Sequence, residues 1–359
     1  MMTVLIYVLA IFFVLLVLIA SHELGHYLAA RSVGIRVERF YIGFNIFGLG
    51  IKKKIGHTEY GLGLLPLGGY VKVAGIVDES MDTKLTGSEW EFQSKNTLQK
   101  VWFMSAGVLA NLLLAGVLFA SLTLVNGIAE ADPAPVVGSL AEDYPAKAAG
   151  IQPGDRITAV NGIPVDSWDK LTNLIHSRPN ETVEVIWERD GEPFLSAIET
   201  RASEILLDDE IKVVGRIGIG PRVSYRSVGI IEAATNGFAL TGRWFVLTYK
   251  TLVMIVTGRA SLREIGGPIL IGQVAGEAAQ KGFDYLLGIL AIISVNLAFI
   301  NVLPIPALDG GHIAIVLVEA ALRRPLSLRA RMAVQQLGVM LLLTLVVVII
   351  YNDIMRIVH

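Results

Sequence analysis

Residues 4–20 form an uninterrupted apolar run, VLIYVLAIFFVLLVLIA, and no other feature constrains the fold so strongly. As a helix this run would rise about 25 Å, close to the thickness of the hydrocarbon core of a bilayer. No basic segment precedes it, and cleavage near Ala20 would leave the polar residues that follow at a frayed terminus, so a membrane span is favoured over a signal peptide. The mean hydropathy of +0.60 also exceeds what a soluble core needs. The sequence therefore predicts a polytopic α-helical membrane protein.

The apolar run leads directly into the pentapeptide HELGH at residues 22–26. On a helix, His22 and His26 lie on one face, one turn apart, and Glu23 lies beside the first of them. Two imidazoles with a neighbouring carboxylate are typical of a zinc site that has its own general base. The chain has no cysteine, so any zinc ligands must be histidines and carboxylates.

A catalytic zinc site uses three protein ligands and keeps one position open, so a third ligand is needed. The best candidate is Asp309 in the segment NVLPIPALDGGH at residues 301–312. Two prolines end the preceding helix, and the glycines after Asp309 allow a tight turn around whatever the carboxylate binds. Alone, Asp309 would be interpreted as a turn or capping residue; together with HELGH we interpret it as a zinc ligand. His312 is left out because a catalytic site keeps an open position.

The hydropathy pattern predicts four transmembrane helices, at residues 4–20, 101–125, 285–303 and 333–351. Residues 31–100 carry ten lysines and arginines, which indicates that this side is cytoplasmic and that the N-terminus is extracytoplasmic. Residues that share one ion must lie at one depth, so the third span must run inward like the first. We therefore expect residues 127–283 to stay outside, with the apolar stretch 244–256 lying along the membrane surface.

Two shorter segments suggest further structural features. Residues 59–75, EYGLGLLPLGGYVKVAG, are too apolar for an ordinary loop and too rich in glycine and proline for a helix, which favours a membrane-reentrant β-hairpin. Its open strand edge would need a protein cavity or a partner strand, and a substrate strand is one candidate. In the second span, Gly107 suits close helix packing, whereas Asn111 is explained equally well by packing and by function.

Residues 127–226 differ in character from the rest of the chain. Short strand-like runs alternate with turn signals, and the segment contains seventeen acidic and ten basic residues. This pattern predicts a compact soluble α+β domain outside the membrane. The series PVVGSLAEDYPAKAAGIQPGDRITAVNG, followed by SWDKLTNLI, resembles a PDZ domain of the bacterial type. The predicted organisation is thus a membrane part at 1–126, the PDZ domain at 127–226, an interfacial amphipathic segment at 227–283 and a second membrane part at 284–359.

Taken together, HELGH, the GxxxN pattern at 107–111, the PDZ-like domain and SVNLAFINVLPIPALDGG at 294–311 resemble the site-2 protease family of intramembrane zinc metalloproteases, in its bacterial branch. The resemblance implies one Zn²⁺ per chain, held by His22, His26 and Asp309, with Glu23 as the general base. It further implies that the substrate is contacted by Asn301 and by the hairpin, whose candidate residues are Leu67, Gly68, Gly69 and Tyr70. The best-known members carry two PDZ domains, whereas this chain has room for one.

The expected activity is hydrolysis of peptide bonds within transmembrane segments, in a bacterial inner membrane, with the active site near the cytoplasmic side. Anti-sigma-factor-type proteins and remnant signal peptides are candidate single-span substrates, peptide C-termini are candidate ligands of the PDZ domain, and no nucleic acid is expected. The alternative is a non-catalytic membrane-anchored PDZ receptor with a structural zinc, against which Glu23 argues because a structural site needs no base. His57, His176 and His359 are interpreted as surface residues.

Overall fold

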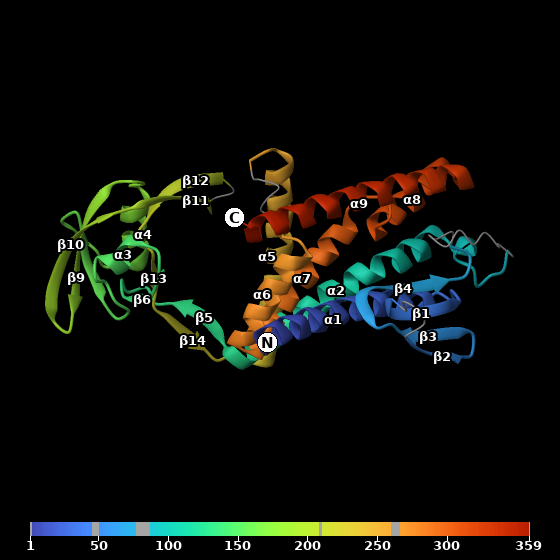
Figure 1. The fold of residues 1–359 in the computed structure, drawn as a ribbon, viewed down its shortest axis with the longest axis horizontal. Helices are drawn as coiled ribbons and strands as arrows, with labels where there is room; N and C mark the ends of the chain where they lie inside the picture. Colours follow the sequence, from blue (N-terminus) through green and yellow to red (C-terminus); the bar gives the residue numbers. More distant parts are fainter. Residues whose placement is uncertain (1, 45–49, 77–86, 208–209, 260–265, 359) are drawn as a thin grey trace. The chain divides into compact units, whose positions relative to one another are not determined.

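The chain forms two compact units. The computed structural model describes residues 2–44, 50–76, 87–207, 210–259 and 266–358. One unit, here called the membrane unit, comprises Met1–Val125 and Gly229–His359; the other, the inserted domain, comprises Asn126–Val228. Figure 1 shows their elements in sequence colours.

Among the described residues, five helices are long and apolar enough to cross a membrane, judged by length and composition. They are α1 (Met2–Ser32), α2 (Thr97–Asn126), α5 (Ile230–Val256), α7 (Phe283–Val302) and α9 (Leu328–Val358). Two shorter helices, α6 (Pro268–Lys281) and α8 (Asp309–Leu322), complete the helical part of the membrane unit. The four predicted spans fall in α1, α2, α7 and α9, and α5 contains the stretch that was expected to lie along the surface.

Helix α2 runs antiparallel to α1 at very close range. The Ser21 hydroxyl donates to the Ala110 carbonyl at 3.3 Å, and further along α1 the ring of His26 bonds to the carbonyl of Phe103. A Cβ on Gly25 would overlap the backbone of Ala106, so the absence of a side chain there lets the two helices touch. The HELGH segment is thereby held directly against α2.

Helix α7 runs parallel to α1. The rings of Phe13 and Phe283 lie 6.0 Å apart near the start of α7, and beyond its end Asp309 approaches His22. Between these points a buried apolar cluster joins α1 and α7 with α6. Its buried members are Ala10, Val14, Leu18, Ala275, Leu286 and Leu290. Because α1 and α7 point the same way, the residues that follow both helices can meet.

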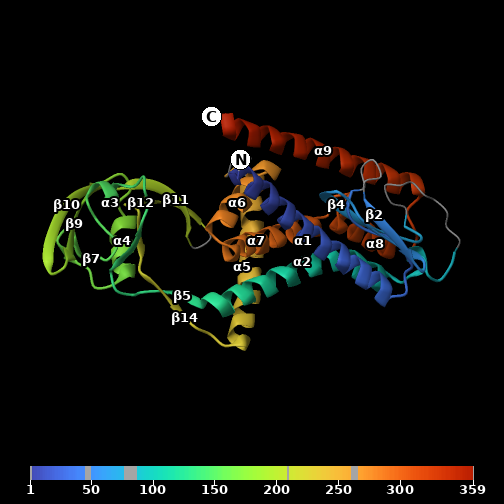
Figure 2. The same ribbon diagram turned by 60° about the horizontal axis from the view of Figure 1, so that its bottom comes forward.

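A four-stranded sheet lies beside α1 (Figure 2). Its strands are β1 (Val37–Phe44), β2 (Ile51–Ile55), β3 (Thr58–Leu62) and β4 (Leu65–Val73), in the order β2-β3-β1-β4. The prediction of a hairpin over residues 59–75 is wrong, because β1 lies between β3 and β4. It pairs in parallel with β3 and antiparallel with β4. Gly63 marks where the chain leaves β3, but it carries no information about a third strand that inserts between β3 and β4.

The side chain of Tyr41 fixes the centre of this sheet. Its ring stacks on that of Tyr70 at 5.1 Å and covers Gly61, where any Cβ would collide with it. Its hydroxyl donates to Glu59 Oε1 at 2.6 Å, and this hydrogen bond raises the pKa of Tyr41 to about 12. One side chain from β1 therefore contacts both neighbouring strands.

The inserted domain is built around a β-sheet of order β10-β9-β7-β8 and one longer helix. Its elements are β5 (Ile128–Ala131), β6 (Val137–Leu140), α3 (Pro145–Ala148), β7 (Arg156–Val160), β8 (Ile163–Pro164), α4 (Trp168–His176), β9 (Thr182–Arg189), β10 (Glu192–Glu199), β11 (Arg201–Leu207), β12 (Glu210–Arg216), β13 (Ile219–Pro221) and β14 (Val223–Arg226). Strands β5 and β14, at its two ends, pair with each other. Buried Asp155 forms a two-point ion pair with Arg189, at 2.7 and 2.8 Å, which ties the 150–155 turn to β9.

Candidate metal centre

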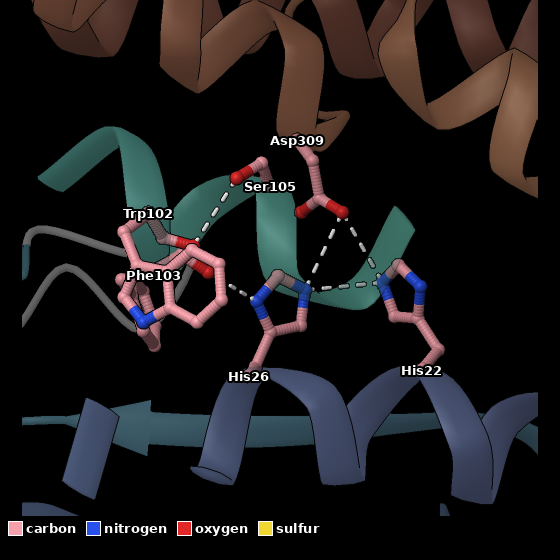
Figure 3. A network of polar contacts seen from close by, with 6 residues as sticks. All are labelled: His22, His26, Trp102, Phe103, Ser105 and Asp309. Carbon is pink, nitrogen blue, oxygen red and sulfur yellow. Dashed lines mark hydrogen bonds and ion pairs between the residues drawn. The ribbon is translucent and has the colours of Figure 1, made fainter. Parts of the chain in front are cut away.

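Three side chains from two helices converge in the membrane unit (Figure 3). His22 and His26 lie one turn apart on α1, and Asp309 is the first residue of α8. Among the described residues, these three form the group of histidine and acidic side chains that could hold a metal ion. The zinc-site hypothesis required the HELGH histidines and Asp309 to lie close together, and in the structure they do.

The segment between α7 and α8 brings Asp309 into position. It folds back over the first turn of α8, and a Cβ on Gly310 would collide with the carbonyls of Val302 and Leu303, while one on Gly311 would collide with that of Ile305. The two glycines were expected to permit a tight turn, but they lie inside α8 and neither has a positive φ. Their role is to let the preceding backbone pack directly against the helix that begins with Asp309.

The three facing atoms form a nearly equilateral triangle. His22 Nε2 lies 3.2 Å from His26 Nε2, and each lies 3.3 Å from Asp309 Oδ2. A tetrahedral zinc with ligands at about 2.0–2.1 Å separates its ligand atoms by about 3.3 Å. Asp309 Oδ2 is also buried and has no hydrogen-bond partner among the described residues, which is costly for a carboxylate unless a cation is bound. The donor set and its spacing fit Zn²⁺.

The ring of His26 is oriented by the backbone of α2. Its Nδ1 lies 2.9 Å from the carbonyl oxygen of Phe103, so Nδ1 carries the proton and donates, and Nε2 is left with a lone pair directed at Asp309 (Figure 3). The preceding residue also links the two helices: the Trp102 indole donates to Ser32 Oγ at 3.0 Å, which ties α2 to the end of α1. The bond to Phe103 thus holds the His26 imidazole in the tautomer that a metal ligand requires.

Gly107 is part of the same site. A Cβ on Gly107 would collide with the rings of both His22 and His26. The sequence assigned this glycine to general helix packing, whereas the structure shows that it makes room for the two imidazoles. Its place in the pattern four residues before Asn111 was the available signal. Asn111 itself is fully buried, and neither its side-chain oxygen nor its nitrogen has a hydrogen-bond partner among the described residues.

Glu23 and strand β4 lie against each other. The Glu23 side chain is buried and interacts electrostatically with His22, His26 and Asp309. A Cβ on Gly69 would lie 2.8 Å from Glu23 Cγ, so only a glycine lets the strand pass this closely to the Glu23 side chain. Among the described strands, β4 is at the edge of its sheet. The site therefore combines a metal-binding triangle, a neighbouring carboxylate and an edge strand.

The remaining residues singled out in the sequence are placed as follows. Gly68 and Tyr70 lie on β4, as does Leu67, whose side chain is outside the described residues. Asn301 is half-buried in the last turn of α7. His312 lies one turn after Asp309, His57 is exposed as predicted, and His359 is outside the described residues.

His176 departs from the prediction of a surface residue. It is half-buried and lines a cavity of about 150 Å³ between α4 and residues 215–221. Burial and the nearby charge of Arg216 lower the pKa of His176.

Comparison with known proteins identifies the relatives of this chain. The model of peptidase family M50 matches residues 10–345. Similar proteins that carry the provisional name zinc metalloprotease occur in Mesorhizobium japonicum, 35% identical over 95% of this chain and 96% of that protein, and in Agrobacterium fabrum, 33% identical over 97% and 95%. Among solved structures, the PDZ domain of an SdrC-like protein from Listeria monocytogenes matches with 24% identity and a TM-score of 0.21, covering 26% of this chain and 90% of that one. With the family model spanning most of its length and relatives this similar, the chain belongs to peptidase family M50.

Proposed function

We propose that this protein is an intramembrane zinc metalloprotease that hydrolyses peptide bonds within transmembrane segments of other membrane proteins. The observation that carries the proposal is the triangle of His22, His26 and Asp309 atoms, at tetrahedral spacing, beside the buried carboxylate of Glu23. Membership of a peptidase family agrees with it and disfavours the non-catalytic receptor with a structural zinc.

The residues of the site divide into metal ligands and a base. His22, His26 and Asp309 would hold the ion. When bound, Zn²⁺ supplies Lewis acidity, which polarises a carbonyl and brings the pKa of water toward about 7. Glu23 accepts the proton of the attacking water and later returns it to the leaving amine. The bond from His26 Nδ1 to the Phe103 carbonyl keeps the ligand ring oriented during this exchange.

Strand β4 would receive the substrate. A transmembrane helix shields its peptide bonds, so a stretch of it must unwind before it can be cut, and its freed N–H and C=O groups then need partners. Addition to a sheet edge provides them and presents the chain in an extended form. Gly68, Gly69 and Tyr70 lie on the edge strand next to Glu23, and Asn301 is proposed as a further backbone contact.

We assign α1, α2, α7 and α9 as the membrane spans and propose that α5 begins and ends on the extracytoplasmic side. Thr248 and Phe245 contact Asn296 and Phe299 in the second half of α7, so the middle of α5 lies within the bundle. Because α2 is antiparallel and α7 parallel to α1, the chain after α2 begins and ends on one side of the membrane unit. A crossing by α5 would need a return crossing, and α6, with 14 residues, extends only about 21 Å. Figures 1 and 2 also show α5 running across α2. The basic residues after α1 favour a cytoplasmic active-site end in a bacterial inner membrane.

We assign the inserted domain as a PDZ domain that engages peptide ends. The cavity between α4 and residues 215–221 supports this role, since Leu171 and Ile175 of the helix face Ile217 and Ile219 across it. An extended peptide can pair with an exposed strand while its side chains fill such a cavity. Substrates trimmed on the outer side, including signal-peptide remnants and anti-sigma-factor-type proteins, have the new chain ends that this groove would bind.

The test is cleavage of a single-span model substrate by the detergent-purified protein, with and without a zinc chelator, and with the cut mapped by mass spectrometry. We expect one or more cuts within the apolar segment, abolished by the chelator. Glu23→Gln should retain zinc by elemental analysis and lose cleavage by at least about a hundredfold, since it removes the base. Asp309→Ala should lose zinc.

The exposed variant Glu89→Gln, outside the site, serves as the matched control and should cleave like the wild type. Full activity of Glu23→Gln would eliminate Glu23 as the base. An unchanged zinc content in Asp309→Ala would eliminate the carboxylate as a ligand.

A further inference from the structure

A second cavity of the membrane unit lies at the end where α2 begins and where α8 is followed by α9. Its volume is about 600 Å³, and its charged lining consists of Lys100, Glu319, Arg323, Arg324 and Arg331. Both Figure 1 and Figure 2 show the start of α2 and the junction of α8 and α9 at the same end of the membrane unit. This cavity contains none of the proposed metal ligands.

The charges of the cavity are unbalanced. Its single carboxylate, Glu319, is bound by Arg331, whose Nε lies 2.9 Å from Oε1, and the backbone N–H of Leu326 donates to the same oxygen. Arg323 and Arg324 have no ion-pair partner among the described residues. Four cations thus face one carboxylate, and such an excess of positive charge attracts an anion.

The surroundings of the cavity indicate what kind of anion it takes. Apart from its charged groups the lining is largely apolar, with Val316 and Ala320 of α8 and Pro325 and Leu326 of the following turn. A group of cations beside apolar lining suits a ligand with a charged head and a hydrocarbon tail. The arginine-rich junction of α8 and α9 also lies on the side that the positive-inside rule assigns to the cytoplasm, where anionic lipids are enriched.

We propose that this cavity binds the phosphate group of an anionic phospholipid. Arg323 and Arg324 contact the phosphate oxygens, Lys100 adds charge from α2, and the acyl chains leave the cavity past Val316, Ala320 and Leu326. Arginine suits this role because its planar guanidinium donates two parallel hydrogen bonds to a phosphate. The proposal rests on the assignment of this unit to the membrane and is independent of the catalytic function.

The test is native mass spectrometry of the purified full chain, after exchange into phosphatidylglycerol or phosphatidylcholine. The wild type should retain phosphatidylglycerol in preference to phosphatidylcholine. Because each cation near a lipid phosphate contributes about fivefold to binding, Arg324→Gln should weaken retention about fivefold, and Arg323→Gln with Arg324→Gln about 25-fold. Glutamine keeps a Cβ at the left-handed backbone of Arg323, so the helix end is unchanged.

The matched control is Lys53→Gln with Lys54→Gln, which removes two exposed cations of β2 outside the cavity and should leave lipid retention unchanged. Equal retention of phosphatidylglycerol by the wild type and the double arginine variant would overturn the proposal. A parallel arm offers glycerol phosphate to the delipidated protein. It should bind far more weakly than the lipid because it lacks acyl chains, and binding as tight as that of the lipid would refute a lipid as the ligand.

Discussion

At the scale of single residues, Gly107 decides whether two imidazoles can share an ion. Any Cβ at this position would collide with the rings of both His22 and His26. We expect Gly107→Ala to lower the zinc affinity at least about tenfold, because changes to the groups that orient metal ligands typically cost that much. The affinity is measured by competition with a chromophoric chelator. Gly242→Ala on α5 is the matched control, since a Cβ there meets open space. Equal affinities in the two variants would contradict the proposed role of Gly107.

His176 provides a prediction on pH at the same scale. Burial and the charge of Arg216 lower its pKa in the folded domain, so the unfolded chain, with a pKa near 6.5, binds the proton more readily. The stabilising effect of a neutral His176 is therefore complete above about pH 6.5 and is lost as the pH falls toward the lower folded-state pKa. Between pH 7.5 and 5.5, the urea midpoint of the inserted domain, followed by pulse proteolysis of the full chain, should fall less in His176→Gln than in the wild type. An identical fall of the urea midpoint in the wild type and in His176→Gln would show that protonation of His176 does not affect the stability of the domain.

At the scale of elements, one carboxylate connects α9 to the beginning of α6. Asp353 is buried and accepts hydrogen bonds from the backbone N–H groups of Gly267 and Ile269 at 3.0 Å, next to the positive end of the α6 dipole. Asp353→Asn removes the charge, which should cost about 1–2 kcal/mol and lower the thermal midpoint by about 4 °C. Differential scanning fluorimetry measures the shift, and the exposed variant Asp143→Asn should show none. A midpoint equal to that of the wild type would mean that α6 does not depend on this cap.

At the scale of the whole molecule, the topology depends on whether α5 crosses the bilayer. The chain has no cysteine, so single cysteines report their side without background. With both ends of α5 outside, Ser227→Cys and Arg259→Cys, which flank this helix, should both react with a membrane-impermeant maleimide in intact cells. Lys53→Cys, on the opposite side, should react only after the cells are opened. Labelling of Arg259→Cys only in opened cells would show that α5 crosses.

The sequence by itself determined the chemistry of the site. His22, Glu23 and His26 belong to one helix, and their spacing is fixed by the helical repeat, which is a local property of the chain. Asp309 could be selected because a catalytic zinc needs a third ligand and because residues bound to one ion must lie at one depth. The apolar runs that form α1, α2, α7 and α9 could also be identified from the sequence, because each is long enough on its own to span a bilayer.

Only the tertiary structure decided the features that depend on distant segments. Strand β1 separates β3 from β4, and no pattern within residues 59–75 encodes a partner from residues 37–44. The sequence alone indicates ordinary helix packing for Gly107, and its role beside the two imidazoles depends on how α1 packs against α2. The glycines after Asp309 likewise indicate a turn, and their actual role depends on the loop before α8 folding back over them. The physical reason is the same in each case: helical and strand periodicity follow from the local backbone, whereas close approach of two segments depends on which surfaces the folded chain brings into contact.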